Sequence, residues 1–204
     1  EAAIKKTRKK TFIWAESGAE DDYTTKKNIE DLKLVQITPR VLRKIKKTSI
    51  KDVFFKTSIS CPLILAPMGH QTQFHKNGEI EMAKGAVKED ILSTFTTQGR
   101  TDLPDIVKKS KNQKIIWQIF LFGDKNWILK QIRKAEANNC LAISICLDAP
   151  NRSYRYSDRE NRYDARKYGN WNMAKSPDPK MALNYDFKII EWIKSKTKLP
   201  IIPK

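Results

Sequence analysis

Residues 114–148 read KIIWQIFLFGDKNWILKQIRKAEANNCLAISICLD, and this stretch decides the fold class. It begins with an apolar run at 114–120, continues through an amphipathic segment at 125–139 and ends in a second apolar run at 141–148. The two apolar runs are short and continuous, a pattern typical of strands that are buried on both faces of a parallel sheet. The segment between them has the length of a helix, so the stretch predicts a strand-helix-strand unit.

The same unit recurs on both sides of this stretch, because other short apolar runs are also accompanied by amphipathic stretches. The further predicted strands are 62–67, 91–95 and 199–202, and the further predicted helices are 79–90, 103–110 and 185–197. Most of the predicted strands begin about 25 residues apart, which matches a strand, a helix and two loops.

These alternating elements fit either a doubly wound sheet or an eight-stranded barrel. A dinucleotide-binding sheet would place the pattern G-x-G-x-x-G after its first strand. Residues 66–79 instead read APMGHQTQFHKNGE, with only Gly69 and Gly78. The sequence therefore favours an α/β fold of the TIM (β/α)8 barrel type, in which chemistry gathers at the carboxyl ends of the strands. The residues near those predicted ends are Pro67, Met68, Gly69, Ser93, Thr94, Gln118, Phe120, Cys146, Asp148 and Lys204.

The chain is strongly basic. Its 204 residues include 40 Lys and Arg against 23 Asp and Glu, a formal net charge of +17, and the 40% that are hydrophobic suffice for a packed core. The lysines are scattered and form no arginine-rich or aromatic-interleaved patch, which argues against specific nucleic-acid recognition. A solvated lysine-rich surface and contact with an anionic membrane or another polyanion both stay open.

The three cysteines, Cys61, Cys140 and Cys146, are odd in number and form no C-x-x-C pair. Neither a disulfide framework nor a metal site is indicated, and a reducing, cytoplasmic location fits best. The sequence has no run of about 18 apolar residues that would span a membrane, and no signal peptide. Because the chain starts at Glu1 and ends on an apolar run at Lys204, we expect it to be part of a longer polypeptide.

Residues 149–184 are too many for an ordinary loop between a strand and a helix, and they are rich in Arg, Tyr, Asp and Asn. Loops of this length are usually active-site lids or disordered segments, and both interpretations stay open here. Arginines just after a strand end suit an anionic substrate, because guanidinium pairs with carboxylate through two hydrogen bonds.

Eight motifs follow one another along the chain. They are SGAEDD (17–22), TPRVL (38–42), PLILAPMG (62–69), HKNGE (75–79), LSTFT (92–96), WQIF (117–120), ISICLDAPNRSYR (143–155) and LPIIPK (199–204). In this order and spacing they resemble the FMN-dependent α-hydroxy acid oxidases and dehydrogenases, such as glycolate oxidase and lactate oxidase. The resemblance covers nearly the whole chain, and the motifs are specific as a set although each alone is weak.

The resemblance implies the N-terminal part of a TIM barrel, with an N-terminal helical segment at 1–60 and the first four to five βα units at 61–204. It implies FMN at the mouth of the barrel, oxidation of an L-2-hydroxy acid to a 2-oxo acid, and a homo-oligomer when complete. In the family, a catalytic histidine, a second substrate-binding arginine and the phosphate-binding turns follow the position of Lys204. We therefore expect these residues alone to be inactive.

The resemblance also implies roles for individual residues. The backbone of Met68 and Gly69 would face the reactive nitrogen of the flavin, and Ser93, Gln118 and Cys146 would line its ring. Lys204 would stabilise the negative charge that builds up as the ring is reduced. Arg155 would clamp the substrate carboxylate. His75 matches a family position for which a packing role is expected, and His70 has no assigned role.

The chain departs from the family pattern at three of its site positions. Trp14 and Phe120 stand where the family usually has substrate-binding tyrosines, and Cys146 stands where a threonine is common. Two substrate hydroxyl contacts are lost and the substrate pocket becomes more apolar, which favours a bulkier hydroxy acid. The lost tyrosines leave open a divergent FMN-binding barrel without ordinary hydroxy acid turnover. The net charge of +17 leaves open a second alternative, a basic dehydrogenase that docks peripherally on the inner face of a membrane.

Overall fold

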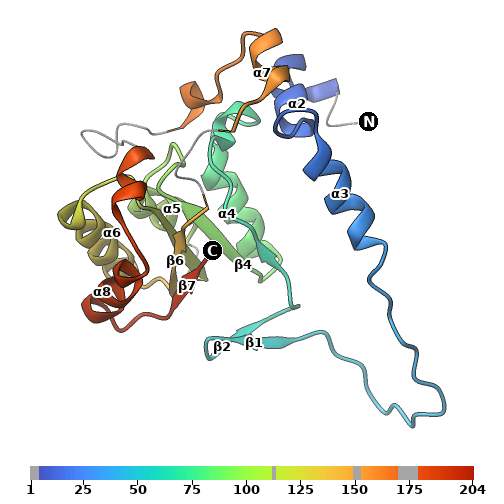
Figure 1. Cartoon of the computed structure of the whole chain (residues 1–204). Helices are drawn as coiled ribbons and strands as arrows, with labels where there is room; N and C mark the ends of the chain where they lie inside the picture. Colours follow the sequence, from blue (N-terminus) through green and yellow to red (C-terminus); the bar gives the residue numbers. More distant parts are fainter. Residues whose placement is uncertain (1–4, 112–113, 149–152, 170–178) are drawn as a thin grey trace. The chain divides into compact units, whose positions relative to one another are not determined.

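The computed structural model contains two compact units (Figure 1). It describes residues 5–111, 114–148, 153–169 and 179–204. The smaller unit comprises Glu1–Ile50 and Arg152–Ala165, and the larger comprises Lys51–Asn151 and Arg166–Lys204. No described helix is long and apolar enough to cross a membrane.

The larger unit is built on a five-stranded parallel sheet. Its strands are β3 (Ile64–Leu65), β4 (Leu92–Thr96), β5 (Ile115–Phe120), β6 (Ala142–Cys146) and β7 (Ile201–Pro203). Each of the five was predicted from an apolar run. They lie in the order β3-β4-β5-β6-β7, so each strand pairs with the one before it and strand order never reverses among the described strands. This is the order of a barrel, because a doubly wound sheet reverses its strand order at a switch point.

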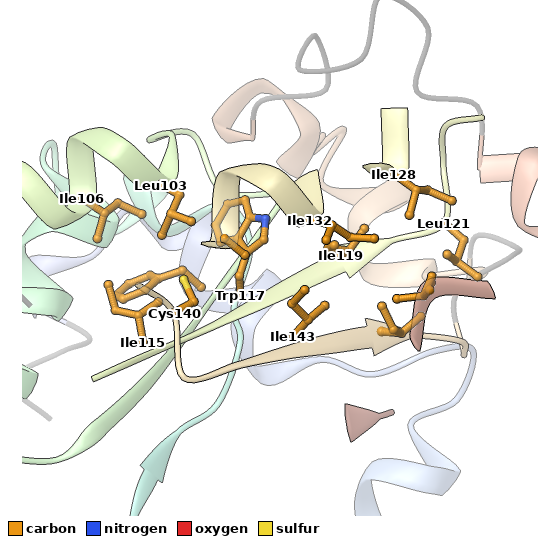
Figure 2. Packing of buried hydrophobic residues seen from close by; sticks show 14 of the residues in the cluster. Leu103, Ile106, Ile115, Trp117, Ile119, Leu121, Ile128, Ile132, Cys140 and Ile143 are labelled. Atoms are coloured by element: carbon orange, nitrogen blue, oxygen red, sulfur yellow. The ribbon is translucent and has the colours of Figure 1, made fainter. Parts of the chain in front are cut away.

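The helices that alternate with these strands pack against one face of the sheet. They are α4 (Gly78–Lys88), α5 (Leu103–Ser110), α6 (Lys125–Ala137) and α8 (Lys188–Lys196), all predicted from their apolar spacing. Figure 2 shows Trp117 of β5 pointing toward the helices, in one buried cluster with Leu103 of α5 and Ile132 of α6. Burial of each such leucine or isoleucine contributes about 1.5–3 kcal/mol relative to exposure.

The opposite face of the sheet carries the polar residues. Because side chains alternate along a strand, Gln118 points away from the helices that cover Trp117. Thr96 of β4 and Ser144 of β6 are the register partners of Gln118 on its two sides. We call the face that carries Thr96, Gln118 and Ser144 the inner face.

The smaller unit contains α2 (Lys9–Glu16), α3 (Tyr23–Leu32) and α7 (Tyr156–Glu160). The hydroxyls of Thr11 and Tyr163 lie 3.1 Å apart and join parts of this unit that are far apart in sequence. Residues 33–50 follow α3 without a helix or strand, and all of them are exposed.

Two features of the fold were not predicted. One is an antiparallel hairpin of β1 (Asp52–Phe54) and β2 (Thr57–Ile59) in the larger unit. The other is the short helical structure inside the segment 149–184, where the described residues form α7, η2 (Ala165–Tyr168) and η3 (Pro179–Asn184). Residues 149–152 and 170–178 of that segment lie outside the described part of the chain, so the lid interpretation stays a prediction.

Candidate functional site

Three of the predicted site residues lie side by side where the central strands end. Phe120 at the end of β5 is the register partner of Cys146 at the end of β6. Lys204 follows β7, and its backbone N–H donates to the carbonyl of Ile145 at 2.8 Å while its carbonyl accepts from the N–H of Leu147 at 2.7 Å. These two bonds place Lys204 directly beside Cys146 in the sheet. The carboxyl ends of three neighbouring strands therefore present an aromatic ring, a thiol and an ammonium group together.

Asp148 joins the thiol and the ammonium group. The Cys146 thiol donates to Asp148 Oδ1 at 2.9 Å, and Asp148 Oδ2 lies 3.8 Å from Lys204 Nζ. Burial of Cys146, which is 5% exposed, raises the pKa of its thiol to about 12, and the neighbouring carboxylate adds to this rise. Accepting the thiol hydrogen bond lowers the pKa of Asp148 below its ordinary value. At neutral pH the group is thus a protonated thiol, a carboxylate and an ammonium in contact.

Gln118 lies one register layer deeper on the inner face. Its side chain is 2% exposed, and its Nε2 has no hydrogen-bond partner among the described residues. A buried amide NH2 without an acceptor is costly, which indicates that a group outside the described chain is meant to accept from it. The flanking hydroxyls of Thr96 and Ser144 are also buried and belong to the same layer. These two residues were not predicted, because nothing in a short apolar run shows which neighbours will share its register.

Ser93 does not join this group. It lies two positions before Phe95 in β4, and Phe95 belongs to the buried cluster on the helix side. Strand alternation therefore directs Ser93 to the helix side and leaves Thr96 on the inner face. The role of Ser93 beside a flavin ring stays a prediction, and the strand geometry does not bring it together with Gln118.

Met68 and Gly69 lie in the turn that follows β3. The carbonyl of Met68 accepts from Gln71 Nε2 at 3.1 Å. A Cβ on Gly69 would come within 3.3 Å of the Gln98 side chain, so a glycine allows the two loops to approach closely. His70 follows in the left-handed region with φ 60° and is buried. The turn therefore lies close against the β4–α5 loop.

Glu79 holds that same β4–α5 loop, and this role was not predicted from the sequence. Its carboxylate is 1% exposed on the first turn of α4, where Oε1 accepts from the Arg100 N–H at 3.1 Å and Oε2 accepts from the Thr101 hydroxyl at 2.9 Å. A Cβ on Gly99 would lie 3.0 Å from Glu79 Oε1, so this loop fits closely around the carboxylate. An acidic residue in a first helical turn is common, and only its burial distinguishes Glu79.

Trp14 and Arg155 lie in the smaller unit and contact each other. Arg155 Nη2 donates to the carbonyls of Trp14 at 2.5 Å and Ser17 at 2.7 Å, and to the Ser17 hydroxyl at 2.9 Å. Arg155 Nε pairs with Asp158 Oδ2 at 3.1 Å, and burial raises the pKa of Asp158. Among the described residues no partner of Nη1 is found. That nitrogen is therefore the part of the guanidinium that these contacts leave unused.

Comparison with known proteins places this arrangement in a family. A family model described as FMN-dependent dehydrogenase matches residues 3–204. The chain belongs to this family. Glycolate oxidase 1 of Oryza sativa subsp. japonica is 26% identical over 219 residues, covering 99% of this chain and 59% of the relative. This FMN-dependent dehydrogenase chain thus spans about three-fifths of the length of the curated relatives it matches.

Solved structures of similar fold agree with the family assignment. A mandelate oxidase mutant with (S)-mandelic acid superposes with a TM-score of 0.88 at 23% identity, covering 99% of this chain and 58% of that one. A lactate oxidase of Pediococcus acidilactici gives a TM-score of 0.86 at 23% identity, with coverages of 100% and 57%. At this identity the likeness shows the fold, and the predicted TIM barrel is confirmed, with the chain forming part of one.

Some residues on the inner face and at the strand ends have the chemistry that would be needed to hold a flavin ring. A ring carbonyl is an acceptor of the kind that the unpartnered Gln118 NH2 lacks. The Lys204 ammonium at the strand ends would supply a positive charge that can stabilise the negative charge of a reduced flavin. Gln118 and Lys204, with the backbone of Met68 and Gly69, are the residues of this chain that would hold FMN.

Proposed function

We propose that this chain contributes the flavin side of a site that oxidises an L-2-hydroxy acid to a 2-oxo acid. One observation carries the proposal: a buried, unpartnered Gln118 amide lies beneath the Cys146 and Lys204 pair at the carboxyl ends of a barrel-type sheet. When bound, FMN would supply the two-electron oxidation of the substrate. The remaining proposed roles, in binding the cofactor and the substrate, belong to residues of the chain.

The proposed binding roles of the residues differ with their charge and polarity. Gln118 donates to a carbonyl of the cofactor, and Lys204 offers positive charge at the end of β7. Arg155 presents Nη1 to the substrate carboxylate while its other nitrogens are held by the chain. Trp14 and Phe120 offer apolar surface without a hydroxyl, which suits a substrate with a bulky apolar side chain. Met68, Gly69 and Cys146 keep the cofactor-lining roles that the family pattern assigns to them, whereas Ser93 lies on the helix side of β4 and does not support that role.

The test begins with cofactor retention. The purified chain is incubated with FMN, freed of unbound cofactor and examined by visible absorption. Because the family's catalytic histidine follows the position of Lys204, the intact protein is then mixed anaerobically with glycolate, L-lactate or (S)-mandelate while flavin bleaching is followed. We expect bleaching, fastest with the bulkiest substrate and slowed at least tenfold by Lys204→Met. The control Lys198→Met removes an exposed lysine of the same segment and should leave the rate unchanged. A colourless protein would refute the proposal for these residues.

A divergent FMN-binding barrel without hydroxy acid turnover is the second candidate. The absence of a hydroxyl at Trp14 and at Phe120 favours it, because two hydrogen bonds to substrate are then lost. The same experiment separates the two functions. Flavin that is retained but stays oxidised with all three acids would support this candidate and contradict the first.

We also propose that residues 33–50 contact an anionic membrane surface, which would place the protein peripherally at the inner face of the cytoplasmic membrane. This segment contains six lysines and arginines and no aspartate or glutamate. Its large apolar residues are all exposed, with Leu42 at 102% and Ile37 at 92%. Interleaved cationic and apolar side chains suit a membrane surface, because the cationic groups can contact the anionic headgroups while the apolar groups contact the acyl chains.

Flotation with lipid vesicles tests this contact. We expect binding to phosphatidylcholine vesicles that contain phosphatidylglycerol, weak binding to phosphatidylcholine alone, and release by high salt. Arg43→Glu with Lys44→Glu should reduce binding several-fold. Lys108→Glu with Lys109→Glu makes the same charge change on α5 and serves as the control. Equal loss in both double variants would show that only net charge matters.

A homo-oligomer, which the family pattern implies, is tested by sedimentation of the same preparations.

A further inference from the structure

We infer that Thr72 and Arg100 are positioning residues. They dock residues 166–169, which we call the strap, onto the loops that follow β3 and β4, and the docked strap braces the Met68–Gly69 turn. All of these residues lie in the larger unit. The consequence for FMN rests on the proposed function, because Met68 and Gly69 hold the cofactor there. The docking itself does not depend on the cofactor.

The strap is held by its last helical carbonyls. It overlaps η2 (Ala165–Tyr168), and carbonyls at the end of a short helix have no partner within that helix. The Thr72 hydroxyl donates to the Tyr168 carbonyl at 2.9 Å, and Arg100 Nη1 donates to the Lys167 carbonyl at 3.2 Å. Thr72 follows β3 and Arg100 follows β4, so side chains from two separate loops hold the same end of η2.

Both donors are themselves fixed by the first turn of α4. The backbone N–H of Arg100 donates to the buried Glu79 carboxylate at 3.1 Å. A Cβ on Gly78 would come within 3.0 Å of the Thr72 backbone nitrogen, so Thr72 packs closely on the start of the helix. The strap is therefore docked on two points that a single helix holds in place.

Gly169 brings the strap against the turn after β3. A Cβ on Gly169 would lie 2.6 Å from His70 Cε1 and 3.1 Å from the Gln98 carbonyl oxygen, so only a residue without a side chain fits there. His70 directly follows Gly69 and has φ 60°, a left-handed conformation that persists where neighbouring contacts hold it. Gln98 is also the residue against which Gly69 packs. Release of the strap should therefore loosen both the turn and the β4–α5 loop beside it.

Limited trypsin digestion of the intact protein tests the docking. Trypsin cleaves after Lys167, at the carbonyl that Arg100 holds, so cleavage requires release of the strap. The rate is measured by mass spectrometry relative to cleavage in the exposed segment 33–50. Thr72→Val removes the hydroxyl with little change of shape and should raise the relative rate about two- to tenfold, the effect of one hydrogen bond on the opening equilibrium.

Two variants make this result specific. Thr72→Ser keeps a hydroxyl and should restore the rate of the parent protein. Ser195→Ala removes a hydroxyl that donates to the Trp192 carbonyl at 2.7 Å on α8, and it should leave the relative rate unchanged. Equal cleavage of Thr72→Val and the parent protein would overturn the docking, and so would an equal rise in Ser195→Ala.

Arg100→Met tests the brace from a position that is distant in sequence from the turn. Hydrogen exchange, followed by mass spectrometry, should become faster in the peptides that contain residues 68–74 and 166–169 together. Faster exchange confined to residues 96–101 would overturn the brace, because Arg100 would then stabilise only its own loop.

The last measurement concerns the cofactor. In the FMN-loaded intact protein, Thr72→Val should speed the release of FMN several-fold, and Thr72→Ser should not. Unchanged release in Thr72→Val would overturn the link between the strap and the cofactor. A protein that retains no FMN would instead refute the proposed function, while cleavage and hydrogen exchange would still decide whether the strap is docked.

Discussion

Replacement of Glu79 by alanine tests how the β4–α5 loop is held. The Glu79 carboxylate is 1% exposed and accepts from the Arg100 N–H and the Thr101 hydroxyl. Hydrogen bonds to a charged group contribute about 1.5–3 kcal/mol each. Loss of both bonds should therefore lower the free energy of unfolding by about 3–6 kcal/mol, a large fraction of the stability of a typical domain.

Equilibrium unfolding in urea, followed by far-UV circular dichroism, measures this loss. With a denaturant slope of about 2 kcal/mol per molar urea, the midpoint should fall by about 2 M. Glu81→Ala is the matched control, because Glu81 lies on the same helix but is exposed and pairs with Lys84 at the surface. Its midpoint should stay near that of the parent chain. Equal midpoints for the two variants would show that the buried carboxylate does not hold the loop.

Three further predictions concern the same larger unit, each measured by urea unfolding. Ile132→Ala should lower the free energy of unfolding by about 2–5 kcal/mol, because removal of a fully buried side chain of the helix-side cluster leaves a cavity. A smaller loss would mean that the neighbouring side chains fill the cavity. Gly99→Ala should destabilise the chain by pressing a Cβ against Glu79, and a neutral result would show that the loop yields freely. The hydrogen bond from Arg133 lowers the pKa of Glu136 in the folded chain. The ionised Glu136 carboxylate therefore stabilises the folded state above the pKa that Glu136 has in the unfolded chain. This stabilisation is lost as the pH falls through the lower pKa of the folded chain. The difference between the parent chain and Glu136→Gln should therefore shrink below about pH 4.5, and a constant difference would contradict this assignment.

The strands and helices of the larger unit were predictable because each depends on its own local pattern. The run at 114–120 became Ile115–Phe120 and the run at 141–148 became Ala142–Cys146. The β1–β2 hairpin was not predictable in the same way. Its turn residues Phe55 and Lys56 both have positive φ, 45° and 65°, without the glycine or asparagine that usually marks such a turn.

The sequence predicted which site residues lie at the ends of strands, but not where their side chains point or which other residues surround them. The rule that chemistry lies at the carboxyl ends brought Phe120, Cys146 and Lys204 together, and the structure places them on neighbouring strands. The direction of Ser93 could not be predicted, because β4 is buried on both faces and its sequence shows no alternation. The burial of Glu79 depends on a loop twenty residues away in sequence, and local pattern carries no information about it.

The contacts of Arg155 limit how it could bind the carboxylate of the proposed substrate. A guanidinium pairs with a carboxylate most specifically through two parallel hydrogen bonds from two nitrogens. Here Nη2 is committed to Trp14 and Ser17, and Nε faces Asp158, so only Nη1 stays available among the described contacts. A two-nitrogen clamp would require the loss of one of these contacts, whereas a one-nitrogen contact would leave them intact and bind more weakly. Arg155 thus joins α2 to α7, and its proposed role as a substrate clamp would be weakened by the cost of giving up these contacts.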